Sequence, residues 1–431
     1  MSADASGRGI KRAIVLAGGG ARGAYEAGVL RFILEELPTR TGKPVDFDIV
    51  CGTSVGAIHA CFLGATAEQG TERGAHLLRI WENLKVDEVF QFSSSNIMSL
   101  PRKILGLRRV AQRLREGQRP DRLYGLLDTE PLERLVLDSI PWRGIRRNLK
   151  AGLIEAVCVA TTQVATGRAV VFVEQAHRNL PAWAGQESIR MQPIRLSPMH
   201  ALASAAIPML FPAVRLGARY YADGGLRLNT PLAPAVRLGA NRILVISLGR
   251  GTYDEVDEGL AQQRVEGFGN PMFLLGKVLN ALMLSPVEAD LARLHFVNDI
   301  IENGSTVFGE DFLGRMNEAS DARGGRPLQR IDDLVIRPSQ DLGVLAGQVL
   351  ADPGRDLELS PFLRLFIRAF GTGAEVRESD LLSYLLFDSA YAGPLADIGY
   401  ADAEAQADQL ATFFSDEPLP QEAESPLGNR T

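Results

Sequence analysis

Apolar residues occur along this chain in two alternating patterns, short continuous runs and longer runs with helical spacing. Residues 12–18 (RAIVLAG) and 47–52 (FDIVCG) are short runs typical of strands buried on both faces. Each is followed by an apolar pattern of helical period, at residues 23–37 and 54–65. We expect the first helix to end at Pro38, because proline lacks the amide proton that a helix interior needs.

The same alternation continues further along the chain. Strands are expected at residues 153–163, 169–175, 219–225, 241–249 and 332–339, with a turn at Thr166 and Gly167. A helix is expected at residues 197–207, opened by Ser197 as its N-cap and ended before Pro208. Strands that alternate with helices predict an α/β protein whose sheet is covered by helices on both faces.

Two less regular regions interrupt the pattern, at residues 86–125 and 251–300. They are candidate lids or membrane-facing insertions of a main domain that we expect to span residues 10–338. Residues 339–414 have a helical pattern and predict a C-terminal helical extension. Residues 1–9 and 415–431 form a loose leader and a polar, proline-containing tail, and we expect both to be disordered.

Composition indicates a globular protein of a reducing compartment. The 431 residues are 46% hydrophobic and 23% charged, and the net charge of −6 argues against binding nucleic acid through the general surface. Cys51, Cys61 and Cys158 have no metal-ligand spacing and are expected to be buried thiols. Residues 10–20 are too short an apolar run for a secretory signal, and residues 271–284 are too short to span a bilayer. We therefore expect a cytoplasmic protein.

A glycine-rich loop follows the first expected strand. Gly18, Gly20 and Gly23 satisfy the G-x-G-x-x-G spacing of loops that hold a dinucleotide pyrophosphate. A glycine-rich turn into a helix also suits other anions, because its amides point at the ligand. The spacing alone therefore leaves open whether this loop binds a cofactor or another negative oxygen.

A second motif, GTSVG, stands where the second strand ends and its helix begins. Gly52, Ser54 and Gly56 have the G-x-S-x-G spacing of a nucleophile elbow, although a structural Gly/Ser turn can produce it too. If the first two strands are parallel neighbours, the glycine loop lies beside Ser54 and serves as an oxyanion hole. A dinucleotide site instead needs an acid near the end of the second strand, but Asp46 and Asp48 lie at its start.

The base that would activate Ser54 is expected to be a carboxylate. His59 follows Ser54 by five residues on one helix and points away from it, and structural roles are favoured for the other histidines as well. These are His76, His177, His200 and His295. Asp223 in YYADGG directly follows a strand, and burial in a water-poor pocket would raise its pKa enough to make it a base. An ordinary Asp-Gly turn is the alternative interpretation.

Three blocks together resemble the patatin-like phospholipase family: GGGARG at residues 18–23, GTSVG at residues 52–56 and ADGG around Asp223. A fourth block, ALASAAIPMLFPAV, resembles the segment before the family's aspartate strand, and the resemblance covers about residues 10–340. It implies a three-layer α/β/α sandwich with a mostly parallel central sheet, related to the α/β hydrolases. It also implies that Ser54 is the nucleophile and Asp223 the base.

The resemblance further implies an oxyanion hole built by the glycine loop, with no metal and no cofactor. Its residues are Gly18, Gly19, Gly20, Ala21, Arg22 and Gly23. Arg22 is expected to brace the loop rather than to contact a phosphate. The expected function is a serine lipid acyl hydrolase of the phospholipase A or lysophospholipase type, which acts through an acyl-serine intermediate. The alternatives are a lipid-binding or scaffold protein of the same fold and a nucleotide-binding oxidoreductase.

Two segments could bring a lipid substrate to such a site. Residues 102–122 contain eight basic and two acidic residues with interleaved apolar ones, which suits a helix lying on an anionic membrane as well as a helix packed on the core. Residues 271–284 could wall an acyl-chain pocket, act as a lid or form a buried or dimer surface. Peripheral contact with an anionic membrane through residues 102–122 is thus one of two open interpretations, and the oligomeric state and lipid preference are not determined by these patterns.

Overall fold

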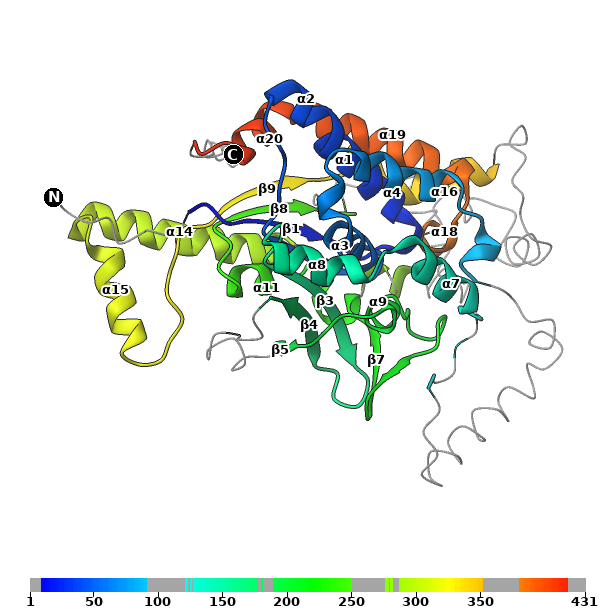
Figure 1. Ribbon diagram of the computed structural model, residues 1–431, viewed down its shortest axis with the longest axis horizontal. Helices are drawn as coiled ribbons and strands as arrows, with labels where there is room; N and C mark the ends of the chain where they lie inside the picture. Colours follow the sequence, from blue (N-terminus) through cyan, green and yellow to red (C-terminus); the bar gives the residue numbers. More distant parts are fainter. Residues whose placement is uncertain are drawn as a thin grey trace, which may run out of the picture.

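The computed structural model describes residues 9–90, 121–122, 125, 127–176, 180, 189–249, 276–278, 280–281, 287–351 and 380–417. Within these ranges one nine-stranded sheet forms the centre of the molecule (Figure 1). Its strands are β1 Arg12–Leu16, β2 Ile49–Thr53, β3 Ala156–Gln163, β4 Ala169–Gln175, β5 Ile189–Pro193, β6 Val214–Leu216, β7 Arg219–Asp223, β8 Arg242–Ile246 and β9 Asp332–Ile336.

The sheet is mostly parallel, in the order β5-β4-β3-β2-β1-β8-β9. The neighbours β3-β2, β2-β1, β1-β8 and β8-β9 are parallel, and so are β4 and β5. The β3-β4 pair is antiparallel, and the β6-β7 hairpin adds antiparallel to the carboxyl end of β3, with Thr161 opposite Asp223. The carboxyl ends of β1, β2 and β3 therefore meet at one edge, where β7 also ends.

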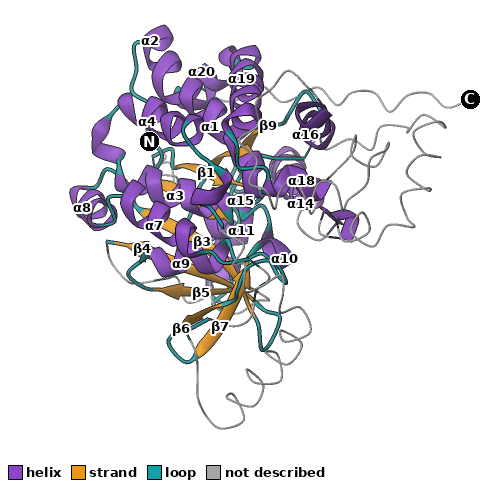
Figure 2. Cartoon of the chain, turned by 90° about the vertical axis from the view of Figure 1, so that its right-hand side faces the viewer, coloured by secondary structure: helices purple, strands orange, loops and turns teal. Residues whose placement is uncertain are grey.

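Helices cover both faces of this sheet, as Figure 2 shows in side view. The α-helices are α1 Gly23–Arg31, α2 Leu37–Thr41, α3 Val55–Ala65, α4 Glu72–Glu82, α7 Glu130–Ser139, α8 Arg143–Ala151, α9 Pro198–Ser204, α10 Gly225–Leu228, α11 Leu232–Arg237, α14 Glu288–Phe308, α15 Phe312–Asp321, α16 Leu342–Ala351, α18 Asp380–Leu385, α19 Ser389–Ala405 and α20 Ala407–Phe414. The shorter helical segments are η1 Gly20–Arg22, η2 Phe32–Glu36, η3 Ala67–Gln69 and η4 Val86–Glu88.

Two apolar cores lie on the two faces, because successive side chains of a strand point to opposite sides. Ile14 and Leu16 of β1 belong to one core, which includes side chains of α1, α3, α4, α7 and α19. Ala13 and Val15 of the same strand belong to the other core, which includes side chains of α11 and α14. The predicted three-layer α/β/α architecture is thus confirmed, and the continuous apolar runs of the strands follow from burial on both sides.

The helix after the glycine loop extends beyond its expected end. Pro38 was expected to end it, but the helical path continues as the π-helix η2 and then α2 as far as Thr41. The amide of Leu37 donates to the carbonyl of Phe32, a wider π-type turn immediately before the proline. This wider turn accommodates Pro38 in the first turn of α2, where its missing amide proton costs little. The chain then leaves the helix at Gly42 in the left-handed conformation.

Two short strands have no counterpart in the sequence analysis. β5 and β6 are partly exposed and contain charged side chains, so neither has the apolar run that identifies the central strands. They are strands because they pair with β4 and β7, not because of their own composition. The other expected strands and the helices at residues 54–65 and 197–207 are present, with ends displaced by up to a few residues.

Several expectations fall on residues that the structure does not describe. Residues 91–120 of the first candidate insertion, and with them nearly all of the basic segment 102–122, lie outside the described residues, and so do residues 250–275 of the second. Of the apolar run 271–284, only 276–278 and 280–281 are described. Among the helices that the structure describes, none combines the length and apolar character needed to cross a bilayer.

The predicted C-terminal helical extension packs against the body of the protein. Figure 1 shows α19, in orange, lying beside α1, in blue. The two backbones approach closely at Gly28, where an added Cβ would lie 1.9 Å from the carbonyl oxygen of Ala396. Tyr391 and Leu395 of α19 are fully buried in the same core as Ile14 of the sheet. The extension therefore shares the main apolar core.

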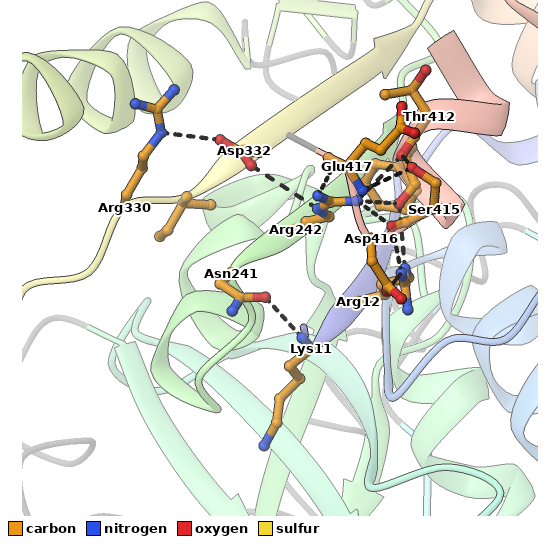
Figure 3. Close-up of polar contacts among 12 residues, drawn as sticks. Lys11, Arg12, Asn241, Arg242, Arg330, Asp332, Thr412, Ser415, Asp416 and Glu417 are labelled. Atoms are coloured by element: carbon orange, nitrogen blue, oxygen red, sulfur yellow. Dashed lines mark hydrogen bonds and ion pairs between the residues drawn. The ribbon is translucent and has the colours of Figure 1, made fainter. Parts of the chain in front are cut away.

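The end of this extension is held at the amino edge of the sheet by two arginines (Figure 3). The Arg242 guanidinium donates to the carbonyl oxygens of Thr412, Phe413, Ser415 and Glu417. Arg12 donates to the carbonyls of Phe413, Phe414 and Ser415. These donors bond to the last carbonyls of α20, of which those of Phe413 and Phe414 have no amide of the helix to accept, and to the carbonyls of Ser415 and Glu417 just beyond it. Residues 415–417, expected to belong to the disordered tail, are thus bonded to the sheet, and residues 418–431 lie outside the described ones.

Replacing Arg242 with alanine should weaken this attachment strongly. The Arg242 side chain is 5% exposed, and its loss removes a buried charged donor from four carbonyls, although Arg12 still donates to those of Phe413 and Ser415. We therefore expect Arg242→Ala to lower the free energy of unfolding by about 1.5–3 kcal/mol, the range for hydrogen bonds to a charged group. Arg330 lies near it but is 44% exposed in its ion pair with Asp332, so Arg330→Ala should cost less than about 1 kcal/mol. Denaturant titration of both variants tests this, and equal losses would contradict it.

Candidate active site

The glycine loop and Ser54 lie side by side because β1 and β2 are parallel neighbours. Each strand ends at the same edge of the sheet, the first in the loop of residues 18–23 and the second in Ser54. An added Cβ on Gly18 would lie 3.1 Å from the Cβ of Ser54, so the loop backbone passes directly against the serine. Nothing in the local sequence places these segments together; the parallel pairing does.

Ser54 occupies a sharp and strained turn between β2 and α3. Its backbone angles are φ 54° and ψ −123°, which a residue with a Cβ rarely adopts. Gly52 and Gly56 on either side make the turn sterically feasible, since a Cβ on Gly52 would lie 2.0 Å from the Gly56 carbonyl oxygen. The expected elbow geometry is thus present, with Ser54 at the N-terminus of an eleven-residue helix.

Asp223 reaches Ser54 through the antiparallel direction of β7. This strand runs toward the carboxyl edge of β3 and ends at Asp223, opposite Thr161. The Ser54 hydroxyl donates a hydrogen bond of 2.7 Å to Asp223 Oδ2, and the Gly225 amide donates one of 2.7 Å to Oδ1. Asp223 is 0% exposed and Ser54 2% exposed. The two residues singled out from distant sequence motifs therefore form one buried pair.

Burial changes the acidity of this carboxyl group. Removal from water raises the pKa of Asp223 from its ordinary value near 3.8 to about 7, while the hydrogen bonds from Gly225 and Ser54 oppose the rise. An ordinary aspartate is far too weak a base to deprotonate a serine hydroxyl. A carboxylate with a pKa close to neutral pH matches the requirement of general base catalysis much better.

Two polar residues absent from the sequence analysis hold this arrangement in place. Ser204 of α9 accepts the Ser54 amide at 2.8 Å and donates to the carbonyl of Ala160 in β3. Asn229 brackets Gly18, accepting its amide through the Asn229 carbonyl and donating Nδ2 to the Gly18 carbonyl. Ser204 lies inside the block ALASAAIPMLFPAV and Asn229 follows ADGG by four residues, and a polar residue in an otherwise small or apolar segment is the signal that could have indicated them.

The hydrogen bonds of the glycine loop divide its amides into two groups. The amides of Gly18, Arg22 and Gly23 donate to carbonyl oxygens of Asn229 or of the loop itself. The amides of Gly19, Gly20 and Ala21 have no protein acceptor among the described residues. Gly20 has φ +58°, a left-handed conformation that breaks the extended course of the chain here. The loop therefore presents a short row of unpaired amides next to Ser54.

The histidines of the described chain have partners elsewhere. His59 is buried, with Nδ1 2.8 Å from a Glu26 oxygen, and accepts the Trp81 indole N–H at Nε2. Burial lowers the pKa of His59 to about 3 and that of His200 to about 4.

The remaining histidines also lie apart from the serine, or outside the described chain. His200 bonds to Ser197 at the start of α9, His76 packs edge-on to Phe62, and His295 contacts Asp333. None of these described histidines hydrogen-bonds to Ser54 or Asp223. His177 lies outside the described residues.

Asp48 is placed as the strand order requires. It lies at the amino end of β2, where its carboxylate accepts the amide of Arg12 at 2.7 Å. This is the edge of the sheet opposite to the glycine loop, so Asp48 has no access to a ligand bound there. Within the described ranges, no three His, Cys, Asp or Glu side chains are grouped in a way that suits a metal ion.

Comparison with known families agrees with the motifs. The family model described as patatin-like phospholipase matches residues 14–236, which is more than half of the chain and includes the glycine loop, Ser54 and Asp223. The chain belongs to the patatin-like phospholipase family. The matched patatin-like region ends before β8, so the family model covers neither β8 and β9 nor the C-terminal extension.

Two curated relatives are similar over more than half of the chain. A cGAMP-activated phospholipase of Pseudomonas aeruginosa is 30% identical over 223 residues, which are 51% of this chain and 53% of that protein. The calcium-independent phospholipase A2-gamma of Oryctolagus cuniculus is 28% identical over 260 residues, 58% of this chain and 29% of that protein. The chain thus spans about half of the first relative and less than a third of the second.

Solved structures give a more distant comparison. VipD from Legionella pneumophila aligns with 90% of this chain and 67% of its own, with 13% identity and a TM-score of 0.28. ExoU in its complex with SpcU from Pseudomonas aeruginosa aligns with 87% of this chain and 74% of its own, with 15% identity and a TM-score of 0.25.

The raised pKa of Asp223 in this patatin-like domain should make the wild type less stable at neutral pH. The unfolded carboxyl ionises near pH 4 and the folded one near pH 7, so the folded chain binds the extra proton between these values. The stabilising contribution is therefore complete below pH 4 and lost as the pH rises through 7. In Asp223→Asn the amide oxygen still accepts from the Gly225 amide, and Nδ2 donates to Ser54 Oγ in place of accepting from it. We expect this variant to be more stable than the wild type by about 2–4 kcal/mol at pH 8, with no advantage at pH 4.

Thermal or denaturant unfolding between pH 4 and pH 9 measures this difference. Asp121→Asn is the control, because the Asp121 side chain is 80% exposed and its replacement removes no buried carboxyl. A stability difference between Asp223→Asn and wild type that does not change with pH would contradict the burial of an ionisable group at this position.

Proposed function

We propose that the chain is a serine acyl hydrolase that cleaves carboxyl esters of membrane lipids, of the phospholipase A or lysophospholipase type. The observation that carries this proposal is the buried hydrogen bond of 2.7 Å from Ser54 Oγ to Asp223 Oδ2. A serine hydroxyl paired with a base of suitable pKa is the arrangement that nucleophilic catalysis requires. The curated relatives, both named phospholipases, support the choice of a lipid ester.

In the proposed reaction, Ser54 Oγ attacks the ester carbonyl carbon as its proton passes to Asp223. The tetrahedral intermediate carries a negative oxygen, which the amides of Gly19, Gly20 and Ala21 can stabilise. Asp223 then returns the proton to the leaving alcohol, and the ester C–O bond breaks to leave an acyl-serine. Water attacks that ester as Asp223 again takes the proton. Asp223 then returns this proton to Ser54 Oγ as the acyl C–O bond breaks, which releases the fatty acid and restores both residues.

The position of Ser54 in the fold favours the developing charge. It precedes α3, and the aligned peptide dipoles of an eleven-residue helix give its N-terminus a partial positive charge. The Ser54 amide itself is occupied by Ser204 Oγ, so it is not available to the intermediate. The glycine loop therefore has to supply the oxyanion donors in this proposal.

An apolar cavity along α3, the helix that begins directly after Ser54, suits a hydrocarbon chain. It has a volume of about 60 Å³ and lies between α3, α4 and α7, starting at Val55, the residue next to Ser54. Ile58, Phe62, Leu77, Trp81 and Phe387 are among the side chains that line it. Burial of methylene groups in such a cavity contributes about 0.8 kcal/mol each. This apolar lining supports an acyl chain as a part of the substrate that the protein recognises.

A lipid-binding or scaffold protein of the same fold is the second proposal. The same apolar cavity would serve it. The unpaired loop amides and the raised pKa of Asp223 favour the enzyme, since a binding protein needs neither. Membrane contact through residues 102–122 and a cytoplasmic location stay predictions from the sequence.

Removal of either member of the pair should abolish ester hydrolysis. We expect Ser54→Ala and Asp223→Asn to lose at least about 10³-fold in kcat/KM on phospholipid or lysophospholipid substrates, because nucleophile and base act as a unit. A fluorophosphonate probe should label the wild type at Ser54, as read by peptide mass spectrometry. Ser305→Ala, on the distant helix α14, is the folded control.

The outcomes separate the two proposals. Labelling of Ser54 with release of fatty acid supports the hydrolase. Tight retention of lipid by wild-type protein, with no labelling and no release, supports the binding protein instead. Full activity in a folded Ser54→Ala or Asp223→Asn variant would exclude this pair as the catalytic groups.

The pH dependence of the rate should report Asp223. A base must be ionised to accept the serine proton, so kcat/KM should rise about tenfold per pH unit below 7 and become constant above it. His177→Ala should keep this profile, because the base in this proposal is not a histidine. Steady-state kinetics from pH 5 to pH 9 measure it. A profile that loses its inflection in His177→Ala would assign the base to that histidine.

A further inference from the structure

The glycine loop is in direct contact with a segment far outside the family match. Arg22 of the loop is 3% exposed, and its Nε donates a hydrogen bond of 2.8 Å to the Ser383 hydroxyl of α18. The Arg22 guanidinium carbon also lies 4.5 Å from the ring centre of Tyr384, a cation–π contact. Ser383 is 0% exposed. Ser383 and Tyr384 lie beyond the family-matched residues 14–236, so Arg22 joins the loop to a part of the chain outside that match.

The backbone of α18 touches the loop as well. A Cβ added to Gly20 would lie 2.3 Å from the carbonyl oxygen of Tyr384, so no side chain fits between the two segments. On its other side the loop passes against Asn229 and Ser54 at Gly18. The unpaired amides of Gly19, Gly20 and Ala21 thus belong to a strip of backbone held between the Ser54 turn and α18.

The segment that makes these contacts is itself firmly attached. α19 follows α18 and packs on α1, the helix that begins where the loop ends, with a close approach of Gly399 to the Tyr25 carbonyl. The Tyr25 hydroxyl donates to Asp402 at 3.0 Å. Phe387, between the two helices, stacks on Trp81 with ring centres 6.1 Å apart. Displacement of α18 would disturb all of these contacts, so α18 can serve as a fixed support.

A support is required because the loop has little rigidity of its own. Three consecutive glycines at residues 18–20 have access to many backbone conformations. An oxyanion is stabilised only when its donors lie within a few tenths of an ångström of the position the oxygen will take. The family-matched part of the chain braces the loop at Gly18 through Asn229, whereas Gly20 and Arg22 are braced by α18.

We propose that Ser383 and Tyr384 are positioning residues that hold the oxyanion loop in its working conformation through Arg22, so that the catalytic unit includes the C-terminal segment 380–405. This inference rests on the proposed hydrolase function. Ser383 fixes the direction of the guanidinium group by accepting a hydrogen bond from its Nε–H, and the Tyr384 ring lies over the face of that group. Neither residue is assigned contact with the substrate.

The expected effect is on the chemical step for each folded active site. Without the Ser383 hydroxyl, a buried guanidinium donor loses its partner and the loop can relax. We expect Ser383→Ala and Tyr384→Leu to lower kcat, per site titrated with a fluorophosphonate, by about 10- to 100-fold, with KM changed less than about threefold. Ser383→Thr, which keeps a hydroxyl, should restore most of the rate.

A second readout separates positioning from general stability. A trifluoromethyl ketone analogue of the substrate forms a tetrahedral adduct whose negative oxygen occupies the hole, so its Ki should rise in step with the fall in kcat/KM. The control is Asn148→Ala in α8, which removes a buried hydrogen bond to the Gly64 carbonyl, at the end of α3 remote from Ser54. It should lower thermal stability while keeping the per-site rate and Ki of the wild type.

The failure of this inference can be told from failure of the proposed function. If wild-type Ser54 is labelled and hydrolyses ester, but Ser383→Ala and Tyr384→Leu keep the wild-type per-site kcat and Ki, the positioning role is overturned and the hydrolase stands. If the wild type is neither labelled by the probe nor able to hydrolyse ester, the hydrolase proposal fails. Amide hydrogen exchange then tests whether Ser383 holds the loop. Ser383→Ala should then speed exchange at residues 18–23 by about 10-fold or more while β3 is unchanged, and equal exchange would overturn it.

Discussion

The arrangement around Ser54 depends on keeping one carboxyl group out of water within hydrogen-bond distance of a hydroxyl. Asp223 is fully buried and bonded to both Ser54 and the Gly225 amide, and this burial raises its pKa to about 7. Such an environment exists only because β7 enters antiparallel at the carboxyl end of β3, while β2 delivers Ser54 to the same edge in the parallel direction. Strand direction thus determines the acidity of the group.

Several features of this site lower the free energy of unfolding, and the surrounding structure compensates for that loss. Ser54 has a strained backbone, Asp223 is a buried acid, and Arg22 is a nearly fully buried cation. Each feature is destabilising when taken alone. Apolar cores on both faces of a nine-stranded sheet supply the opposing free energy, and the polar atoms are matched individually, as Ser204 does for the Ser54 amide.

The C-terminal extension is tied to both edges of the sheet rather than attached at one point. At the carboxyl edge, Ser383 and Tyr384 contact the glycine loop. At the amino edge, Arg12 and Arg242 donate hydrogen bonds to carbonyls at the end of α20 and to that of Ser415 just after it (Figure 3). Between these two attachments the extension packs on α1, the helix that begins where the glycine loop ends. The boundary expected at residue 338 therefore separates sequence patterns, not independent bodies.

Local chemistry determined much of what could be predicted from the sequence. Apolar runs identified the central strands, and small residues around Ser54 and Asp223 marked the turns, because these features act over a few neighbouring residues. The prediction that the first helix ends at Pro38 was wrong, because a π-turn accommodates the proline. Short strands β5 and β6 were missed because their pairing, not their own composition, makes them strands.

Tertiary structure alone decided which groups meet. No pattern near Ser54 indicates that Asn229 and Ser204 would hold its loop and its amide, or that Arg22 would find Ser383 in another part of the chain. These contacts join residues separated by more than a hundred positions, so their energy depends on how the whole sheet and its helices pack. The sequence determines the residue types and their spacing. The distances between the site residues, their burial and the raised pKa of Asp223 arise only when the strands pack together.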